Sequence, residues 1–223
     1  MRALLLLILL AACARPMTQN ERAFIDSVHG AEVDTSRVRF HDGALIGGIV
    51  FERPPRPQLA CRERIWPPEE GPSVEVSTAA FVLGSRMFVA KNYQRDDWLA
   101  SYPETLPLPQ AMLLAHELTH VWQWQARDVT GYNPLRAVGE QIEAEDPYLF
   151  DVAADRPFLD YPYEQQASIV EEYVCCRALD PEGARTARLS ALLTPQFPGI
   201  ADRERAGRIM IPYADAEIRG ICS

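Results

Sequence analysis

The sequence predicts a single α+β domain in which a small β-sheet is flanked by helices around a central helix. Short apolar segments bounded by Gly, Asp and Pro are typical of strands, and longer segments with apolar residues at helical spacing are typical of helices. The run 112–124 contains no Gly or Pro and is apolar almost all round, as in a buried central helix. Without a short N-terminal segment, about 210 of the 223 residues remain, enough for one domain with a substantial core.

The elements follow in order along the chain. A capping box of Thr18 and Glu21 predicts a helix that ends at Gly30. Residues 128–163 show little periodicity apart from 135–144, so we expect a wall or lid of a substrate cleft there. The other expected elements are strands over 38–41 and 44–51 paired at Asp42-Gly43, a proline-rich loop over 54–72, a hairpin of 81–83 with 86–91, and helices from Pro162, over 182–193 and over 202–210.

The central helix carries the most informative motif, H-E-x-x-H from His116 to His120. Residues four apart lie on one face of a helix, so both imidazoles can reach one metal ion while Glu117 points toward a bound water. The alternative is a pair of ordinary core histidines, which would be costly to bury together with a carboxylate. The longer motif H-E-x-x-H-x-x-G-x-x-H is excluded, because Gln123 and Ala126 stand at its last two fixed positions.

A catalytic zinc site needs a third protein ligand and an open position for water. The helix that begins at Pro162 offers three glutamates. We expect Glu164 to be the ligand, with Glu171, two turns further along the same face, as the alternative. Glu172 is rotated away from that face and is expected to be solvated.

The residues around this glutamate carry a family resemblance. Glu164 to Ala167 resemble the E-x-x-A signature of gluzincins, and the chain more narrowly resembles the minimal zincin-like family of Vgr-related proteins. The matching segments are T-x-x-E-x-x-x-x-x-S-V-x-G at 18–30, VRFH at 38–41, HELTHVWQWQ at 116–125 and EQQASIVEEY at 164–173. The resemblance implies a zincin-like fold, Zn²⁺ bound by His116, His120 and Glu164, and peptide hydrolysis.

One position departs from the gluzincin pattern. Many gluzincins carry Asp four residues after the ligand glutamate, where it orients a zinc-binding histidine, and here that residue is Ser168. A hydroxyl orients an imidazole only weakly. Either another acceptor holds His116 or His120, or the metal affinity is reduced.

The chemistry of such a site can be stated from the residues. Zinc would lower the pKa of a bound water and polarise a scissile carbonyl. Glu117 would act as the general base and pass the proton to the leaving amine. A structural zinc site would not require Glu117. Candidates for stabilising the oxyanion are Tyr161, Tyr163, Tyr173 and His41.

A strand ahead of the central helix is the expected binding site for an extended substrate. We expect it to be an edge strand that pairs with the backbone of a peptide. Its residues are Arg86, Met87, Phe88, Val89, Ala90 and Lys91.

The N-terminus resembles the signal peptide of bacterial lipoproteins. Arg2 precedes an apolar run that is too short to span a bilayer, and Leu10-Ala11-Ala12-Cys13 resembles a lipobox. The resemblance implies a signal peptide over 1–12, lipid on Cys13, a tether over 13–17 and the single domain over 18–223. Because Ala14 is not Asp, it implies a cell-envelope protein on the outer membrane that faces the periplasm. The alternative is an ordinary secretory signal.

Cysteine usage agrees with export, and charge limits the partners. If Cys13 carries lipid, an even set of four remains. We expect the neighbours Cys175 and Cys176 each to pair with Cys61 or Cys222, because a bridge between neighbours would be strained. Cysteines as extra zinc ligands are the alternative, although they lack C-x-x-C spacing. A formal net charge of −9 argues against nucleic acid as a partner.

The leading function is therefore zinc-dependent cleavage of a peptide or an envelope protein. A second possibility is a peptidoglycan cross-link endopeptidase, although nothing in the chain resembles a cell-wall binding module. A third is a zinc-stabilised binding lipoprotein without turnover, which the departure at Ser168 keeps open.

Overall fold

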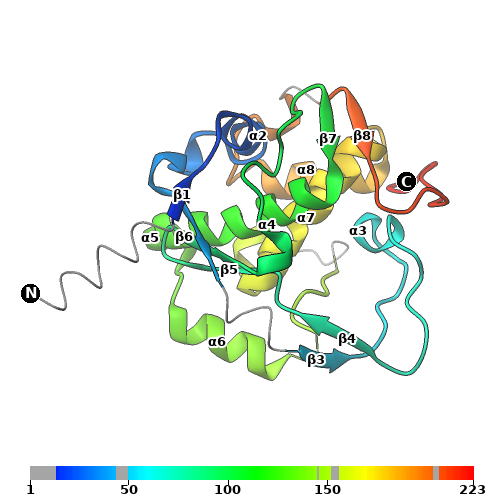
Figure 1. Cartoon of the computed structure of the whole chain (residues 1–223), viewed down its shortest axis with the longest axis horizontal. Helices are drawn as coiled ribbons and strands as arrows, with labels where there is room; N and C mark the ends of the chain where they lie inside the picture. Colours follow the sequence, from blue (N-terminus) through cyan, green and yellow to red (C-terminus); the bar gives the residue numbers. More distant parts are fainter. Residues whose placement is uncertain (1–13, 44–49, 145, 152–155, 203–205) are drawn as a thin grey trace, which may run out of the picture.

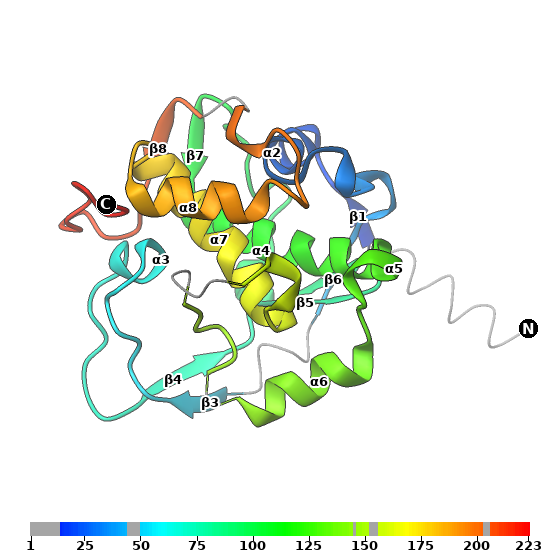
Figure 2. The same cartoon turned by 180° about the vertical axis from the view of Figure 1, so that it is seen from behind.

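The computed structural model describes residues 14–43, 50–144, 146–151, 156–202 and 206–223. These residues form a mixed α+β fold with small sheets and several helices, as the sequence predicts (Figures 1 and 2). None of the described helices combines the length and apolar character needed to cross a membrane.

Two long helices, α4 and α7, lie side by side at the centre of the molecule (Figures 1 and 2). Proline stands near the start of each helix, where its missing N–H is not needed, and their interiors contain neither Gly nor Pro. The helices are α2 (Gln19–His29), α3 (Cys61–Arg64), α4 (Leu108–Gln125), α5 (Arg127–Thr130), α6 (Pro134–Glu143), α7 (Tyr163–Leu179) and α8 (Ala184–Leu193). Short 3-10 turns lie at Gly30–Glu32, Thr35–Arg37, Lys91–Tyr93, Phe158–Asp160 and Ile200–Asp202.

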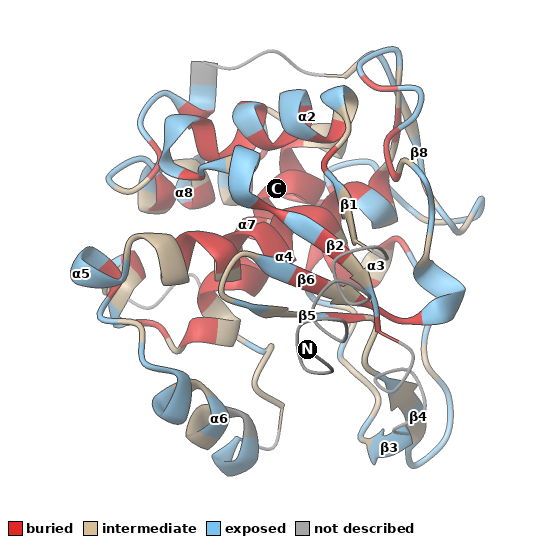
Figure 3. Cartoon of the chain, turned by 60° about the vertical axis from the view of Figure 1, so that its left-hand side comes forward, coloured by how far each residue is buried: buried red, intermediate tan, exposed pale blue. Residues whose placement is uncertain are grey.

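The largest sheet lies in front of α4 and α7 in Figure 3, with the buried residues between the layers. Its strand order is β1-β2-β6-β5, in which β2 and β6 are parallel and the other pairs antiparallel. Two smaller sheets pair β3 with β4 and β7 with β8. The strands are β1 (Ala14–Pro16), β2 (Arg39–Asp42), β3 (Val50–Arg53), β4 (Val74–Ser77), β5 (Ala80–Leu83), β6 (Arg86–Val89), β7 (Thr105–Pro107) and β8 (Arg208–Met210).

Local signals place several elements correctly. The capping box at the start of α2 is present, with both hydrogen bonds between Thr18 and Glu21 formed at 2.9 and 3.1 Å. The hairpin of β5 and β6 is also confirmed, with Leu83 opposite Arg86 across the Gly84-Ser85 turn. Both features depend only on residues close in sequence.

The expected hairpin at Asp42-Gly43 is wrong. Strand β2 pairs with β1 and β6, whereas β3 pairs with β4 in a separate sheet; residues 44–49 lie outside the described part. The N–H of Gly43 donates to the carbonyl of Val89 and so continues the parallel alignment with β6 instead of turning back.

Three further expectations are corrected by the strand pairing. The strand at 86–91 is not an edge strand, because β6 lies between β2 and β5. Residues 208–210 form β8 against β7 rather than helix, while 203–205 lie outside the described part. Residues 14–16, expected in a tether, form β1 on the largest sheet, and Met17 after them is buried. In each case a distant partner decides the local structure.

Candidate metal centre

Three side chains from α4 and α7 converge on one point. The Nε2 atoms of His116 and His120 each lie 3.3 Å from Oε2 of Glu164. These three ligand atoms all lie within 4.8 Å of one another. A tetrahedral zinc ion with bonds of about 2.0–2.1 Å holds its ligand atoms about 3.3–3.4 Å apart. The donor set could therefore hold a metal ion, and its two distances to Glu164 match the spacing of zinc ligands.

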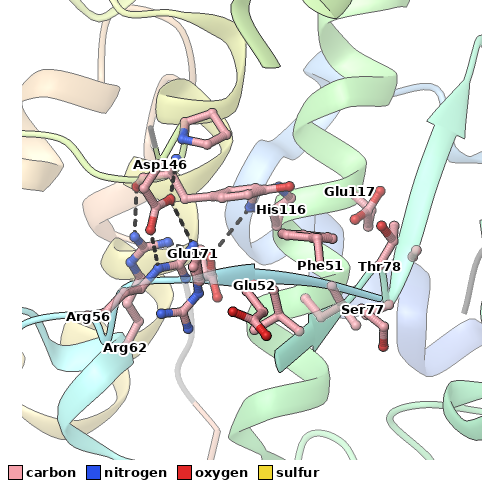
Figure 4. Close-up of a pocket in the computed structure, with 17 residues that line it drawn as sticks. Phe51, Glu52, Arg56, Arg62, Ser77, Thr78, His116, Glu117, Asp146 and Glu171 are labelled. Carbon is pink, nitrogen blue, oxygen red and sulfur yellow. Dashed lines mark hydrogen bonds and ion pairs between the residues drawn. The ribbon is translucent and has the colours of Figure 1, made fainter. Parts of the chain in front are cut away.

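Glu117 lies beside this cluster and lines a cavity of about 300 Å³ together with His116 (Figure 4). Its side chain is buried, and Oε2 has no hydrogen-bond partner among the described residues. Burial raises the pKa of the Glu117 carboxyl. A buried carboxylate oxygen without a partner, on a residue that lines a cavity, is suited to a ligand that the protein itself does not supply.

The other nitrogen of each histidine has its own acceptor. His116 Nδ1 lies 3.4 Å from Oε2 of Glu171, and His120 Nδ1 lies 2.9 Å from Oε1 of Gln123. Gln123 is fixed in turn, because its Nε2 donates to the carbonyl of Tyr163 and to Gln166. Both rings are therefore oriented with Nε2 toward Glu164, which is how outer partners commonly prepare metal-binding imidazoles.

These contacts distinguish between the alternatives that the sequence leaves open for α7. Ser168 is fully buried, and its Oγ has no hydrogen-bond partner among the described residues, so it does not orient a histidine. Glu171 takes that place for His116 and lies on its Nδ1 side, away from the converging Nε2 atoms. The role of Gln123 as a partner of His120 is not among the sequence predictions, although its position three residues after His120 puts it on the same helix face.

Glu172 is not solvated as expected. Its carboxylate is completely buried, accepts the backbone N–H groups of Cys61 and Arg62 at 3.0 Å each, and pairs with Arg185 at 2.6 Å. Glu172 does point away from the metal ligands, as its helical position predicts, but α3 and Arg185 cover that face of α7.

Mutual pairing shifts the ionisation of the cluster. Burial disfavours the charged imidazole, yet hydrogen bonds to Glu164 and Glu171 raise the pKa of His116 to about 10. Burial also opposes ionisation of Glu171, yet His116 and Arg62 lower its pKa to about 2. The two histidines likewise hold the pKa of Glu164 well below its usual range. Without metal, the site is thus held together by a protonated imidazole between carboxylates.

We expect the metal-free protein to lose stability as pH rises from about 6.5 to about 10. The folded pKa of His116 exceeds its unfolded value, so its contribution is complete below about 6.5 and disappears as the folded pKa is passed. Urea unfolding of chelator-treated protein across this range measures the loss. His116→Gln should show a smaller decline, and an identical pH profile for both proteins would contradict the assignment.

The cavity wall comes from segments far apart in sequence. Residues of β3 and β4 line one side, and Asp146, Pro147 and Tyr148 line another, within the region expected to form a cleft wall. Arg56 pairs with Asp146 through two hydrogen bonds of 2.7 and 2.9 Å (Figure 4). The Tyr148 ring lies 5.8 Å from the ring of His116, centroid to centroid.

None of the expected oxyanion-stabilising residues lines this cavity. The hydroxyls of Tyr161, Tyr163 and Tyr173 each donate to a backbone carbonyl elsewhere. His41 lies on the largest sheet, stacked on Phe88. The tyrosine that does line the cavity is Tyr148. It is not among the sequence predictions, because it stands in no recognisable motif.

The substrate strand also needs revision. None of the residues 86–91 lines the cavity, whereas residues 76–80, which lead into β5, do. Among the described strands, β5 forms the edge of the sheet on this side.

The four cysteines pair as expected in outline. Cys61 is bonded to Cys175, and Cys176 is bonded to Cys222, so each neighbour on α7 reaches a different distant segment. Because their sulfurs are consumed in disulfides, these cysteines are not additional zinc ligands.

Comparison with known proteins gives a likeness in fold. No protein-family model matches the chain, and no curated protein sequence matches it. A solved structure, the effector domain of Pseudomonas aeruginosa VgrG2b, matches with a TM-score of 0.51 over 81% of this chain and 82% of that one, at 20% identity. The described fold is therefore similar to that of a VgrG effector domain.

Proposed function

We propose that this protein is a zinc-dependent peptidase with a zincin-like fold. One observation supports the proposal: Nε2 of His116 and Nε2 of His120 each lie 3.3 Å from Oε2 of Glu164, beside a carboxylate oxygen of Glu117 that has no hydrogen-bond partner among the described residues. A structural zinc site would be closed by a fourth protein ligand and would not need that carboxylate. The likeness to an effector domain is compatible with an enzyme but does not identify its reaction.

The proposed roles follow from position. Zinc held by the three ligands would supply Lewis acidity and an activated water. Glu117 accepts the proton of the attacking water and returns it to the leaving nitrogen of the peptide bond. Glu171 and Gln123 keep both imidazoles aimed at the metal position. Tyr148, on the cavity wall, is the proposed hydrogen-bond donor to the substrate.

The function is tested by a cleavage profile. Purified protein, with and without zinc, is offered a mixed peptide library, and the products are identified by mass spectrometry. Zinc-dependent cleavage within peptides supports the proposal. Zinc bound at full occupancy without any cleavage would favour a non-catalytic binding protein instead.

We further propose that an extended substrate pairs with the free edge of β5. The N–H of Ala90 donates to the carbonyl of Ala79, so Ala79 faces β6. Backbone groups alternate along a strand, so those of Ala80 and Val82 face the open edge. Ala80 also lines the cavity.

Ala80→Pro is expected to lower kcat/KM by at least about tenfold through loss of one pairing N–H, without loss of zinc. Kinetics on a peptide found in the library screen and elemental analysis provide the two measurements. Met210→Pro, at the exposed end of strand β8 and outside the cavity lining, is the comparison. Unchanged kinetics for Ala80→Pro would contradict pairing at this edge.

The proposed location is the cell envelope, through lipid on Cys13, which lies outside the described residues. Cys13→Ser is expected to move the protein from the membrane fraction to the soluble fraction, because a lipid rather than a helix would hold it. Fractionation and labelling with a fatty-acid analogue measure this. Membrane retention of unlabelled Cys13→Ser protein would contradict lipid anchoring.

A further inference from the structure

Arg62 lies outside both metal-binding helices but belongs to a chain of contacts that ends at His116. We propose that Arg62 is a positioning residue for the metal centre and that the Cys61–Cys175 disulfide holds it in place. This inference rests on the proposed zinc site. It assigns a role to a residue that the H-E-x-x-H and E-x-x-A segments do not include.

The first link joins Arg62 to the metal ligand through one carboxylate oxygen. Oε2 of Glu171 lies 3.4 Å from Nδ1 of His116 and 3.2 Å from a terminal nitrogen of Arg62 (Figure 4). The Arg62 side chain is only 5% exposed, so water does little to screen this pairing. Without Arg62, Glu171 would be a partly buried carboxylate with one charged partner fewer. Its position against His116 would then be less well determined.

The second link joins Arg62 to the cavity wall. Its other terminal nitrogen donates to the carbonyl of Tyr148 at 2.7 Å. The guanidinium group is planar and offers donors in a fixed arrangement, so it can hold a carboxylate and a carbonyl at once. Arg62 thus sets the positions of both Glu171 and the Tyr148 segment relative to His116.

The third link concerns how the short helix that carries Arg62 is held in position. Arg62 belongs to α3, a single turn that is too short to be stable by itself. Its backbone is held on α7 by two devices: the carboxylate of Glu172, which accepts the N–H groups of residues 61 and 62, and the Cys61–Cys175 bond. Cys175 lies one helical turn after Glu171, so the disulfide fixes α3 directly beside the carboxylate that Arg62 contacts.

The neighbouring disulfide provides a matched comparison within the same helix. Cys176, at the next position of α7, is bonded to Cys222 near the C-terminus, a segment that α3 contacts through hydrogen bonds from Arg64. Both bonds tie α7 to a distant segment, and both should stabilise the fold. If the inference is correct, loss of the first bond weakens zinc binding more than loss of the second.

The experiment measures zinc affinity of the full chain by competition with a chromogenic chelator at fixed pH. Arg62→Gln is expected to weaken zinc binding by about 10- to 100-fold, the usual scale for outer partners of a metal ligand. Arg62→Lys keeps the positive charge but lacks the two terminal nitrogens that contact Glu171 and Tyr148, so a smaller loss of zinc affinity is expected. In a Glu171→Gln background, Arg62→Gln should add little, because the two act through one path.

The disulfides are tested in the same assay. The double variant Cys61→Ser with Cys175→Ser is expected to bind zinc about three- to tenfold more weakly, since Glu172 still holds the α3 backbone. The double variant Cys176→Ser with Cys222→Ser should lose less affinity than this, even where its unfolding midpoint falls. Circular dichroism is used to check that each protein is folded. If Arg62→Gln does not fold, the zinc affinity of Arg62→Lys tests whether Arg62 positions the metal centre.

Each outcome bears on a separate claim. Wild-type zinc affinity in folded Arg62→Gln or Arg62→Lys would overturn the positioning role. Equal losses in both disulfide variants would overturn the role of the Cys61–Cys175 bond. Wild-type protein that binds no zinc would overturn the proposed metal site itself, and that result is distinguishable because it precedes any variant.

Discussion

Glu117→Gln is expected to lower peptide hydrolysis by at least about a hundredfold while zinc content and fold stay unchanged. The amide has nearly the same shape as the carboxylate but cannot accept the proton of the attacking water. Because Oε2 has no partner among the described residues, its replacement breaks no hydrogen bond within the described part of the protein. Initial rates on a library-derived peptide and elemental analysis measure the two properties.

A matched control is Glu143→Gln on α6, which removes an exposed carboxylate and should leave the rate unchanged. Two outcomes would count against the peptidase. Equal cleavage by wild type and Glu117→Gln would mean that the activity arises elsewhere. Zinc binding by both proteins without cleavage by either would leave a binding protein as the better description.

The second large effect concerns the metal. His120→Ala and Glu164→Ala are each expected to reduce the zinc content of protein purified without added metal to near zero, because a site with two protein ligands holds zinc poorly. Glu171→Ala should instead retain zinc at lower affinity, since Glu171 lies on the Nδ1 side of His116. Loss of zinc only in Glu171→Ala, and not in Glu164→Ala, would reverse the assignment of the third ligand.

The sequence could predict what depends on neighbours along one helix. The spacing of His116 and His120 fixes their common face, and the position of Glu164 follows from a second local segment. Gln123 was within reach of the same reasoning, since it lies one turn beyond His120. For these residues the helix itself supplies the geometry.

The sequence could not predict what depends on a distant partner. Arg62 lies 109 residues before Glu171, and no periodicity links them. A glutamate such as Glu172 is normally exposed to solvent. It is buried here because α3 and Arg185, which lie elsewhere in the sequence, supply its hydrogen-bond partners. The place of β6 inside the sheet likewise depends on strand order, which its own residues do not encode.

Strand β1 has a mechanical consequence for the whole molecule. Ala14–Pro16 is paired along its length with β2, and Arg15 holds the buried Glu21 through two hydrogen bonds of 2.8 and 2.9 Å. If Cys13 carries a lipid anchor, the anchor is attached to the residue directly before β1, with no linker between them. A force applied at Cys13 would then act on a strand that is hydrogen-bonded to the largest sheet, and not on a flexible linker.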